Sequence, residues 1–269
     1  MNGLVGIIGG GNMGSAIIGG MLKTGLLTPA QLIAADANEK TCIALREQYG
    51  IQADTDNKKV AQSVQWLFLA VKPQIYASVI KEIRDIIAPD CVIISIAAGQ
   101  TLKGLTQQFG HPVKLVRAMP NTPALVGEGM SALTPNDLTT PEELNIVQQI
   151  FESFGKTVVV PEHDMDIITA VSGSSPAYVF MFLEAMADAA VLGGMPRDMA
   201  YRCCAQAVLG SAKMMLETGL HPGVLKDMVC SPGGTTIEAV AELEKQGMRQ
   251  AIMSAIKVCQ EKSQKMTKA

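Results

Sequence analysis

The chain has 269 residues, of which 48% are hydrophobic and only 17% are charged, against a usual charged share of about 25%. This composition excludes a disordered chain, and the length suits one or two domains with a large core. The formal net charge of −3 argues against a nucleic-acid partner, because phosphate binding needs a surplus of Lys and Arg.

The six cysteines include no Cys-x-x-Cys pair and only three His are present, so the sequence predicts neither a metal site nor a disulfide framework. Residues 1–9 lack the basic segment of a targeting signal. The most apolar stretch, residues 177–195, carries Glu184 and Asp188, which a bilayer would make costly. We therefore expect a cytoplasmic protein without a membrane partner.

Short β-branched runs alternate with longer amphipathic stretches as far as residue 161. The runs cover residues 4–8, 32–35, 66–71, 91–96, 113–118 and 157–160. Apolar runs without polar alternation are typical of strands buried on both faces of a parallel sheet. Residues 1–161 are therefore predicted to form an α/β domain with a Rossmann-like doubly wound sheet.

After Pro161 the strand signal stops, and helices are expected to begin at Ser175, Pro196 and Met248. The helix from Pro196 is apolar apart from a thin line of Arg202, Gln206, Lys213 and Glu217. A helix with so little polar face must be enclosed by other helices. Residues 162–269 are therefore predicted to form an all-α dimerisation domain, and the protein a homodimer.

A Gly-x-Gly-x-x-Gly turn follows the first expected strand and opens a helix. Gly9 permits the tight turn, Gly11 lets the backbone approach a pyrophosphate, and Gly14 lets the helix pack against the strand. The helix start, which includes Asn12 and Met13, supplies amide donors for the phosphates. The arrangement predicts a dinucleotide site.

The second expected strand ends at Asp36, 22 positions after Gly14. An acidic residue there would bind the ribose 2′-hydroxyl of NAD. Asn38 and Lys40 lie just beyond it and could serve a 2′-phosphate if Asp36 turned away, and a solvated Asp at a strand end needs no ligand at all. Spacing alone leaves the choice between NAD and NADP open.

Two segments of mostly small residues follow later core strands and are expected at the carboxyl edge of the sheet, where ligands bind. They are Ala70, Val71, Lys72 and Pro73, and Ala97, Ala98 and Gly99. Small residues leave room for a cofactor, although Lys72 alone is equally well explained as a surface charge.

The second half contains the segment Ser-Pro-Gly-Gly-Thr-Thr at residues 231–236. Thr235 with Glu238 three residues on fits a capping box, which needs no ligand. Free amides and hydroxyls at a helix start also suit a small carboxylate. The spacing does not separate the two interpretations.

The chain resembles the pyrroline-5-carboxylate reductase family over nearly its whole length. Six motifs carry the resemblance, in this order: GxGxxG, AVKP (70–73), AAG (97–99), NTP (121–123), SGSSPAY (172–178) and SPGGTT. This family makes L-proline in the last step of proline biosynthesis by reducing the cyclic imine Δ1-pyrroline-5-carboxylate with NADPH or NADH. The resemblance implies NADPH as the preferred cofactor with NADH tolerated, and dimers that could assemble into a ring of five.

The resemblance also implies roles for single residues. Residues 9–14 would hold the pyrophosphate, Asn57 and residues 70–73 would line the adenine and ribose side, and residues 97–99 with Asn121 would flank the nicotinamide. The substrate would be held by Ser231, Gly233, Gly234, Thr235 and Thr236, and by Glu162 as a substrate-side acid. Some relatives have Asn where this chain has Met228, so any polar contact from that position is absent here.

Hydride addition to a C=N carbon is easier when the nitrogen is protonated, so positioning is most of the enzyme's task. Thr236 is the candidate catalytic residue, either as a proton donor or as an orienting group. His111, His163 and His221 are interpreted as structural or solvated.

Two alternative functions make different demands on the sequence. A β-hydroxyacid dehydrogenase would share the architecture but needs a Lys on the first long helix of its second domain, and this chain has no Lys between residues 160 and 201. A catalytically silent NADP-binding scaffold that signals through dimerisation would not need SPGGTT.

Overall fold

The computed structural model describes residues 3–268. It divides into two compact units. The first, which we call the sheet unit, comprises Met1–Ser174 and Cys259–Ala269, and the second, the helical unit, comprises Ser175–Val258. Residues 162–174 thus belong to the sheet unit by compactness, and the proposed boundary at residue 161 stays a prediction.

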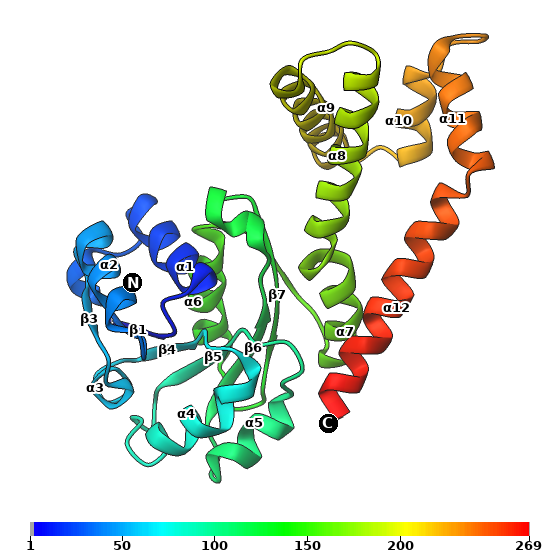
Figure 1. The fold of residues 1–269 in the computed structure, drawn as a ribbon. Coiled ribbons are helices and arrows are strands. Elements are labelled where there is room, and N and C mark those ends of the chain that lie inside the picture. Colours follow the sequence, from blue (N-terminus) through cyan, green and yellow to red (C-terminus); the bar gives the residue numbers. More distant parts are fainter. Residues whose placement is uncertain (1–2, 269) are drawn as a thin grey trace. The chain divides into compact units, whose positions relative to one another are not determined.

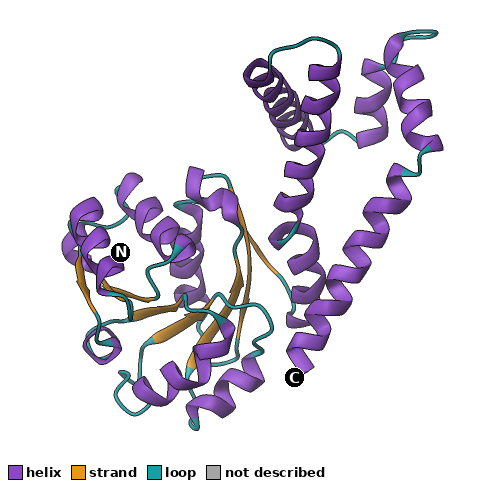
Figure 2. Ribbon diagram, in the orientation of Figure 1, coloured by secondary structure: helices purple, strands orange, loops and turns teal. Residues whose placement is uncertain are grey.

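An eight-stranded sheet in the order β3-β2-β1-β4-β5-β6-β7-β8 forms the centre of the sheet unit (Figures 1 and 2). The strands are β1 Val5–Ile8, β2 Leu32–Ala35, β3 Gln52–Asp54, β4 Trp66–Leu69, β5 Val92–Ser95, β6 Lys114–Met119, β7 Gly129–Pro135 and β8 Gly155–Val159. All neighbours are parallel except β6 and β7, so β7 and β8 run against the rest. The order from β3 to β6 is that of a doubly wound dinucleotide-binding sheet, as predicted.

Helices cover both faces of this sheet (Figure 2). They are α1 Asn12–Lys23, α2 Glu39–Tyr49, α3 Asn57–Ala61, α4 Tyr76–Ile83, α5 Leu102–Phe109 and α6 Pro141–Glu152. One face packs against α1, α2 and α6 through a core that includes Ile17 and Phe151. The other packs against α3, α4 and α5 through a core that includes Ile80 and Phe109. Burial on both faces explains why the strands carry uninterrupted apolar runs.

Two strands escape the sequence prediction because they are not uniformly apolar. β3 is only three residues long and contains Gln52 and Asp54, and β7 carries Ser131 and Thr134, both buried. The apolar run in β6 contains Arg117, whose side chain is only 2% exposed. The core around β6 and β7 therefore contains buried polar side chains.

The second half is helical, as predicted from the helix starts. Beyond the short turns η4 Glu162–Asp164 and α7 Met165–Ile168 and the π-helical turn Thr169–Gly173, the helices are α8 Ser175–Leu192, α9 Arg197–Thr218, α10 Pro222–Val229, α11 Thr235–Lys245 and α12 Met248–Lys268. Gly219, in the left-handed conformation, ends α9. The last residues of α12, from Cys259, belong to the sheet unit.

The helical unit has almost no core of its own. Among its residues only Ala187, Ala200 and Cys204 are buried, while Leu192 is 90% exposed and Leu216 is 85% exposed. The continuous helical stretch Glu162–Leu192 is long and apolar enough to cross a membrane by length and composition alone, although only 6% of its apolar 18-residue window is buried. Apolar surface of this extent needs another surface to cover it, which agrees with the prediction of helices enclosed between subunits.

Candidate active site

The carboxyl ends of the parallel strands bring the predicted cofactor residues together at one edge of the sheet. The glycine-rich turn follows β1, residues 70–73 follow β4, residues 97–99 follow β5, and Asn121 follows β6. Asp36 follows β2, and Asn57 begins the helix after β3. This edge is where open α/β sheets bind ligands.

The three glycines of the turn are required for different reasons. Gly9 has φ +109°, and a Cβ on it would lie 2.6 Å from the Ala70 carbonyl oxygen; a Cβ on Gly14 would lie 2.1 Å from the Gly9 carbonyl oxygen. A Cβ on Gly11 would meet nothing within 4 Å. Packing within the chain therefore explains Gly9 and Gly14, whereas the open space beside Gly11 is what the close approach of a pyrophosphate requires.

The helix that begins at this turn presents uncapped amides. Gly11 is the N-cap residue of α1, and no side chain accepts a hydrogen bond from the first turn of the helix. The first turn also contains no acidic residue. Free N–H groups at the positive end of the helix dipole favour an anion.

The Asp36 carboxylate is occupied by the backbone. Its Oδ2 accepts a hydrogen bond from the Gly10 N–H at 2.8 Å, and its Oδ1 accepts one from the Asn38 N–H at 2.9 Å. Asp36 thus ties the glycine-rich turn to the start of α2. Asn38 caps that helix by accepting from the Lys40 N–H, and the Lys40 side chain is exposed.

Other residues at the edge differ in how free their side chains are. Asn121 is 8% exposed, and its amide donates to the Ser172 carbonyl and accepts from the Met130 N–H, so its side chain holds the backbone together. The Asn57 amide donates to Glu82 at 2.9 Å. Lys72 is exposed and makes no ion pair within the described residues.

In the helical unit, residues 231–234 form a tight turn. The Gly234 N–H donates to the Ser231 carbonyl at 3.0 Å, with Pro232 second and Gly233, at φ +65°, third in the turn, which are the residue types a type II turn requires. A Cβ on Gly234 would lie 2.3 Å from the Ser231 hydroxyl oxygen. The two glycines are therefore fixed by the turn and by Ser231.

The turn leads into α11 without a side-chain cap. The N-cap residue is Gly234, not Thr235, so the capping box expected between Thr235 and Glu238 does not form. Within residues 3–268, the hydroxyls of Ser231, Thr235 and Thr236 have no hydrogen-bond partner. Three free hydroxyls and uncapped helical amides form a set of donors suited to a carboxylate ligand.

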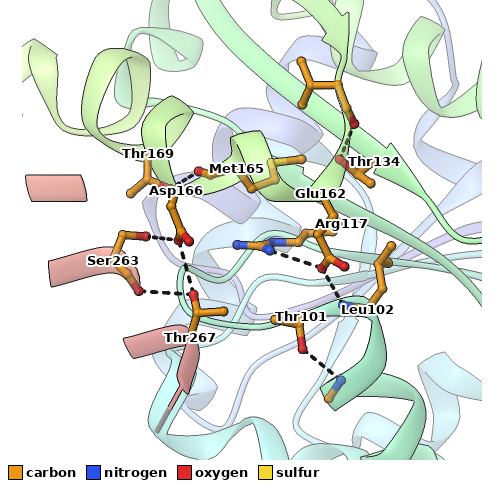
Figure 3. Close-up of polar contacts among 12 residues, drawn as sticks. Thr101, Leu102, Arg117, Thr134, Glu162, Met165, Asp166, Thr169, Ser263 and Thr267 are labelled. Atoms are coloured by element: carbon orange, nitrogen blue, oxygen red, sulfur yellow. Dashed lines mark hydrogen bonds and ion pairs between the residues drawn. The ribbon is translucent and has the colours of Figure 1, made fainter. Parts of the chain in front are cut away.

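Glu162 lies in the sheet unit, where its carboxylate is bound on two sides. Its Oε1 accepts from the Leu102 N–H, at the start of α5, at 2.7 Å and from the Arg117 guanidinium at 3.2 Å (Figure 3). Sequence reasoning missed Arg117. An arginine inside the apolar run of β6 was the available signal, because a buried charge needs a partner.

The described residues contain no group of three or more His, Cys, Asp and Glu that could hold a metal ion. His221 accepts a hydrogen bond from the Gly223 N–H at the start of α10, and His111 contacts the Arg84 carbonyl. These contacts agree with the interpretation of both as structural.

The fold and the glycine-rich turn define a Rossmann-type nicotinamide-dependent oxidoreductase. The profile of the family "NADP oxidoreductase coenzyme F420-dependent" matches residues 4–99, and that of "Pyrroline-5-carboxylate reductase dimerisation" matches residues 162–266. The chain is 54% identical over 265 residues to the pyrroline-5-carboxylate reductase of Escherichia coli K12, with 98% of each chain covered.

Solved structures agree with this relationship. A pyrroline-5-carboxylate reductase from Coxiella burnetii is 32% identical with a TM-score of 0.92, covering 98% of each chain. The pyrroline carboxylate reductase of Plasmodium falciparum, solved with NADP bound, is 32% identical with a TM-score of 0.90, covering 99% of this chain and 98% of that one. The chain belongs to the pyrroline-5-carboxylate reductase family.

Proposed function

We propose that this chain reduces Δ1-pyrroline-5-carboxylate to L-proline with a hydride from NAD(P)H. The observation that carries the proposal is the pairing of two donor sets in one chain of this family. The first is the uncapped, open turn at Gly11, which suits a dinucleotide pyrophosphate. The second is the set of free hydroxyls at residues 231–236, which suits a small carboxylate.

The reaction adds one hydride to the imine carbon and leaves the nitrogen with its proton, so protonated imine and NAD(P)H give proline and NAD(P)+. The nicotinamide supplies the hydride when it is bound. The chain contributes by holding the two reactants with the reacting atoms about 3 to 3.5 Å apart. Small side chains at Ala97 and Ala98 leave room for the ring beside the strand ends.

The residues of the 231–236 segment bind the substrate in this proposal. Ser231, Thr235 and the amides of Gly233 and Gly234 hold the carboxylate. Thr236 donates a hydrogen bond to the ring nitrogen, and orientation of the ring is its main contribution. Glu162 stays the candidate substrate-side acid, although its two contacts with Leu102 and Arg117 support a structural role as well.

NADPH is the preferred cofactor and NADH a tolerated one in this proposal. The support is that both oxygens of Asp36 already accept backbone N–H groups, while Asn38 and the exposed Lys40 lie at the start of the next helix. A lysine there can neutralise a 2′-phosphate. Residues 9–14 hold the pyrophosphate, and Asn57 with residues 70–73 line the adenosine side.

A coupled turnover assay tests the activity. Purified chain should oxidise NADPH only when Δ1-pyrroline-5-carboxylate is present, with proline formed in equal amount. Tight NADPH binding without turnover of this imine would contradict the proposal and favour a non-catalytic dinucleotide-binding scaffold.

The cofactor preference is tested by the ratio of kcat/KM for NADPH to kcat/KM for NADH. Lys40→Met should lower this ratio, and Asp36→Ser should raise it if the carboxylate faces the ribose. Lys81→Met, which removes an exposed lysine on α4, is the matched control and should leave the ratio unchanged. An unchanged ratio in Lys40→Met would remove the support for NADPH.

The chain is further proposed to work as a cytoplasmic homodimer joined through the helices of residues 162–269, with a ring of five dimers as the larger assembly. The apolar exposed surface of the helical unit supports the dimer. Light scattering after size-exclusion chromatography measures the assembly, and a monomer at micromolar concentration would contradict it.

A further inference from the structure

The last turns of α12 contact the sheet unit through one helical face. Cys259, Ser263, Met266 and Thr267 are spaced so that they share that face. Cys259 donates to the Ser174 hydroxyl, Ser263 is only 4% exposed, and Met266 packs beside Gly99. Three hydrogen-bonding side chains, together with Met266, therefore fix the last turns of α12 within the sheet unit.

Asp166 is the main anchor of this contact. Its Oδ1 accepts a hydrogen bond from the Ser263 hydroxyl at 2.6 Å, and the Thr267 hydroxyl lies 3.3 Å from the same oxygen and 3.1 Å from the Ser263 carbonyl (Figure 3). Hydrogen bonds to a carboxylate are roughly twice as strong as neutral ones. The two hydroxyls one turn apart hold the helix end in one register.

That register places Met266 against the loop after β5. Gly99 has φ +77°, and a Cβ on it would lie 3.1 Å from the Met266 Cβ and 3.4 Å from the Met266 backbone. The helix end thus lies so close to the loop proposed to flank the nicotinamide that a side chain at position 99 would press against it. A loop held in this way does not have to be ordered when a ligand binds.

The far end of the same loop is held from the same helical segment. Glu162, four residues before Asp166, accepts from the Leu102 N–H, while its other partner is the buried Arg117. Figure 3 shows the two carboxylates pointing in different directions, Glu162 toward Arg117 and Leu102 and Asp166 toward Ser263 and Thr267. One carboxylate thus bonds the residue that follows the loop, and the other, four residues later, holds the helix end that lies beside Gly99.

We propose that Asp166, acting through Ser263, Thr267 and Met266, is a positioning residue that pre-orders the 97–101 loop for the nicotinamide end of the cofactor. This inference rests on the proposed function, because it takes residues 97–99 as the nicotinamide-flanking loop. It assigns a role in the oxidoreductase reaction to the end of the chain, which carries no substrate or cofactor motif. Loosening the anchor should weaken binding of the nicotinamide end and leave binding of the adenosine end unchanged.

The test compares two probes by titration calorimetry: NADP+ and 2′-phospho-ADP-ribose, which lacks the nicotinamide. The double variant Ser263→Ala/Thr267→Val removes both donors with little change in volume and should weaken NADP+ binding about 3- to 10-fold, as expected for the loss of one or two hydrogen bonds. Its Kd for 2′-phospho-ADP-ribose should stay within twofold of the unmodified chain. Ser254→Ala, which removes an exposed hydroxyl elsewhere on α12, is the matched control and should change neither Kd.

Two further variants keep the test decisive if the double variant folds poorly. Asp166→Asn keeps an acceptor without the charge and should give a smaller loss for NADP+ than the double variant, and Thr267→Ser, which keeps the hydroxyl, should behave as the unmodified chain. Equal losses for both probes, or no loss for either, would overturn the positioning role. If the unmodified chain fails to bind NADP+ or to reduce the imine, the proposed function fails instead.

Discussion

The ion pair between Arg117 and Glu162 gives an asymmetric prediction for stability. Arg117 is 2% exposed and Glu162 is 32% exposed, with 3.2 Å between the guanidinium and the carboxylate. Glu162→Gln keeps an acceptor for the Leu102 N–H but leaves the buried guanidinium without a counter-charge. Breaking a buried pair in this way costs about 3–5 kcal/mol, and the partial exposure of Glu162 puts this case near about 3 kcal/mol.

The opposite substitution should cost much less. Arg117→Met replaces the guanidinium by an apolar side chain of similar length, and the remaining carboxylate keeps its bond to the Leu102 N–H and its access to water. Loss of one hydrogen bond predicts a cost of about 1 kcal/mol in the free energy of unfolding. Burying an apolar methionine in place of a charged guanidinium makes this cost smaller. The double variant should be close to Arg117→Met, so the two changes are coupled by about 3 kcal/mol, the whole cost of Glu162→Gln alone.

The assay is urea unfolding followed by the fluorescence of Trp66, the single tryptophan, which is 6% exposed in β4. Protomer concentration must be equal in all samples, because subunit association contributes to stability. For a chain of this size Glu162→Gln should also lower Tm by about 6–12 °C. If Arg117→Met destabilises the sheet unit as much as Glu162→Gln does, the argument from buried charge is refuted.

Three other predictions concern the candidate site and the sheet. Thr236→Ala should lower kcat/KM about tenfold, the value of one hydrogen bond, while Thr236→Ser stays near the unmodified rate; equal rates in all three chains would show that the hydroxyl has no role. Gly11→Ala should leave Tm unchanged but weaken dinucleotide binding at least about tenfold by blocking the pyrophosphate, whereas Gly14→Ala should lower Tm because its Cβ meets the Gly9 carbonyl; a fluorescence titration and a thermal melt separate the two effects. Burial alone would raise the pKa of Glu143, but hydrogen bonds from Lys114 and the Thr140 N–H bring it below its ordinary value of 4.5. The ionised Glu143 therefore contributes stability that is present above pH 4.5 and is lost as pH falls through the folded pKa. The stability difference between the unmodified chain and Lys114→Met should therefore shrink between pH 5 and pH 3 in urea titrations, and a constant difference would contradict the assignment.

The sequence was sufficient for the regular parts of the fold because those parts repeat a simple pattern. Apolar runs identified the strands buried on both faces, and Pro and Gly marked the ends of α9. It was not sufficient for β3 and β7, where short length and buried polar residues hide the strand period. Whether such segments form strands depends on contacts with residues far apart in the chain.

The same distinction holds for the site. Gly9, Gly11 and Gly14 could be predicted because their roles depend on local backbone geometry. The contacts of Asp166 with Ser263 and Thr267 join residues about a hundred positions apart, so no local sequence pattern predicts them. The Thr235–Glu238 pair illustrates the reverse error, since the correct spacing for a capping box is present but the helix begins at a different residue.

Because the helical unit has so few buried residues, dilution of the protein should destabilise the fold of that unit. Three buried side chains cannot offset the conformational entropy of ordering a segment of this length, so the fold of this unit depends on association with another chain. Protomer concentration then acts as a thermodynamic variable like temperature or denaturant. A newly made chain therefore has to associate with another chain before its exposed leucine and methionine side chains aggregate non-specifically. The fraction of chains that reach the native state then depends on the level of expression.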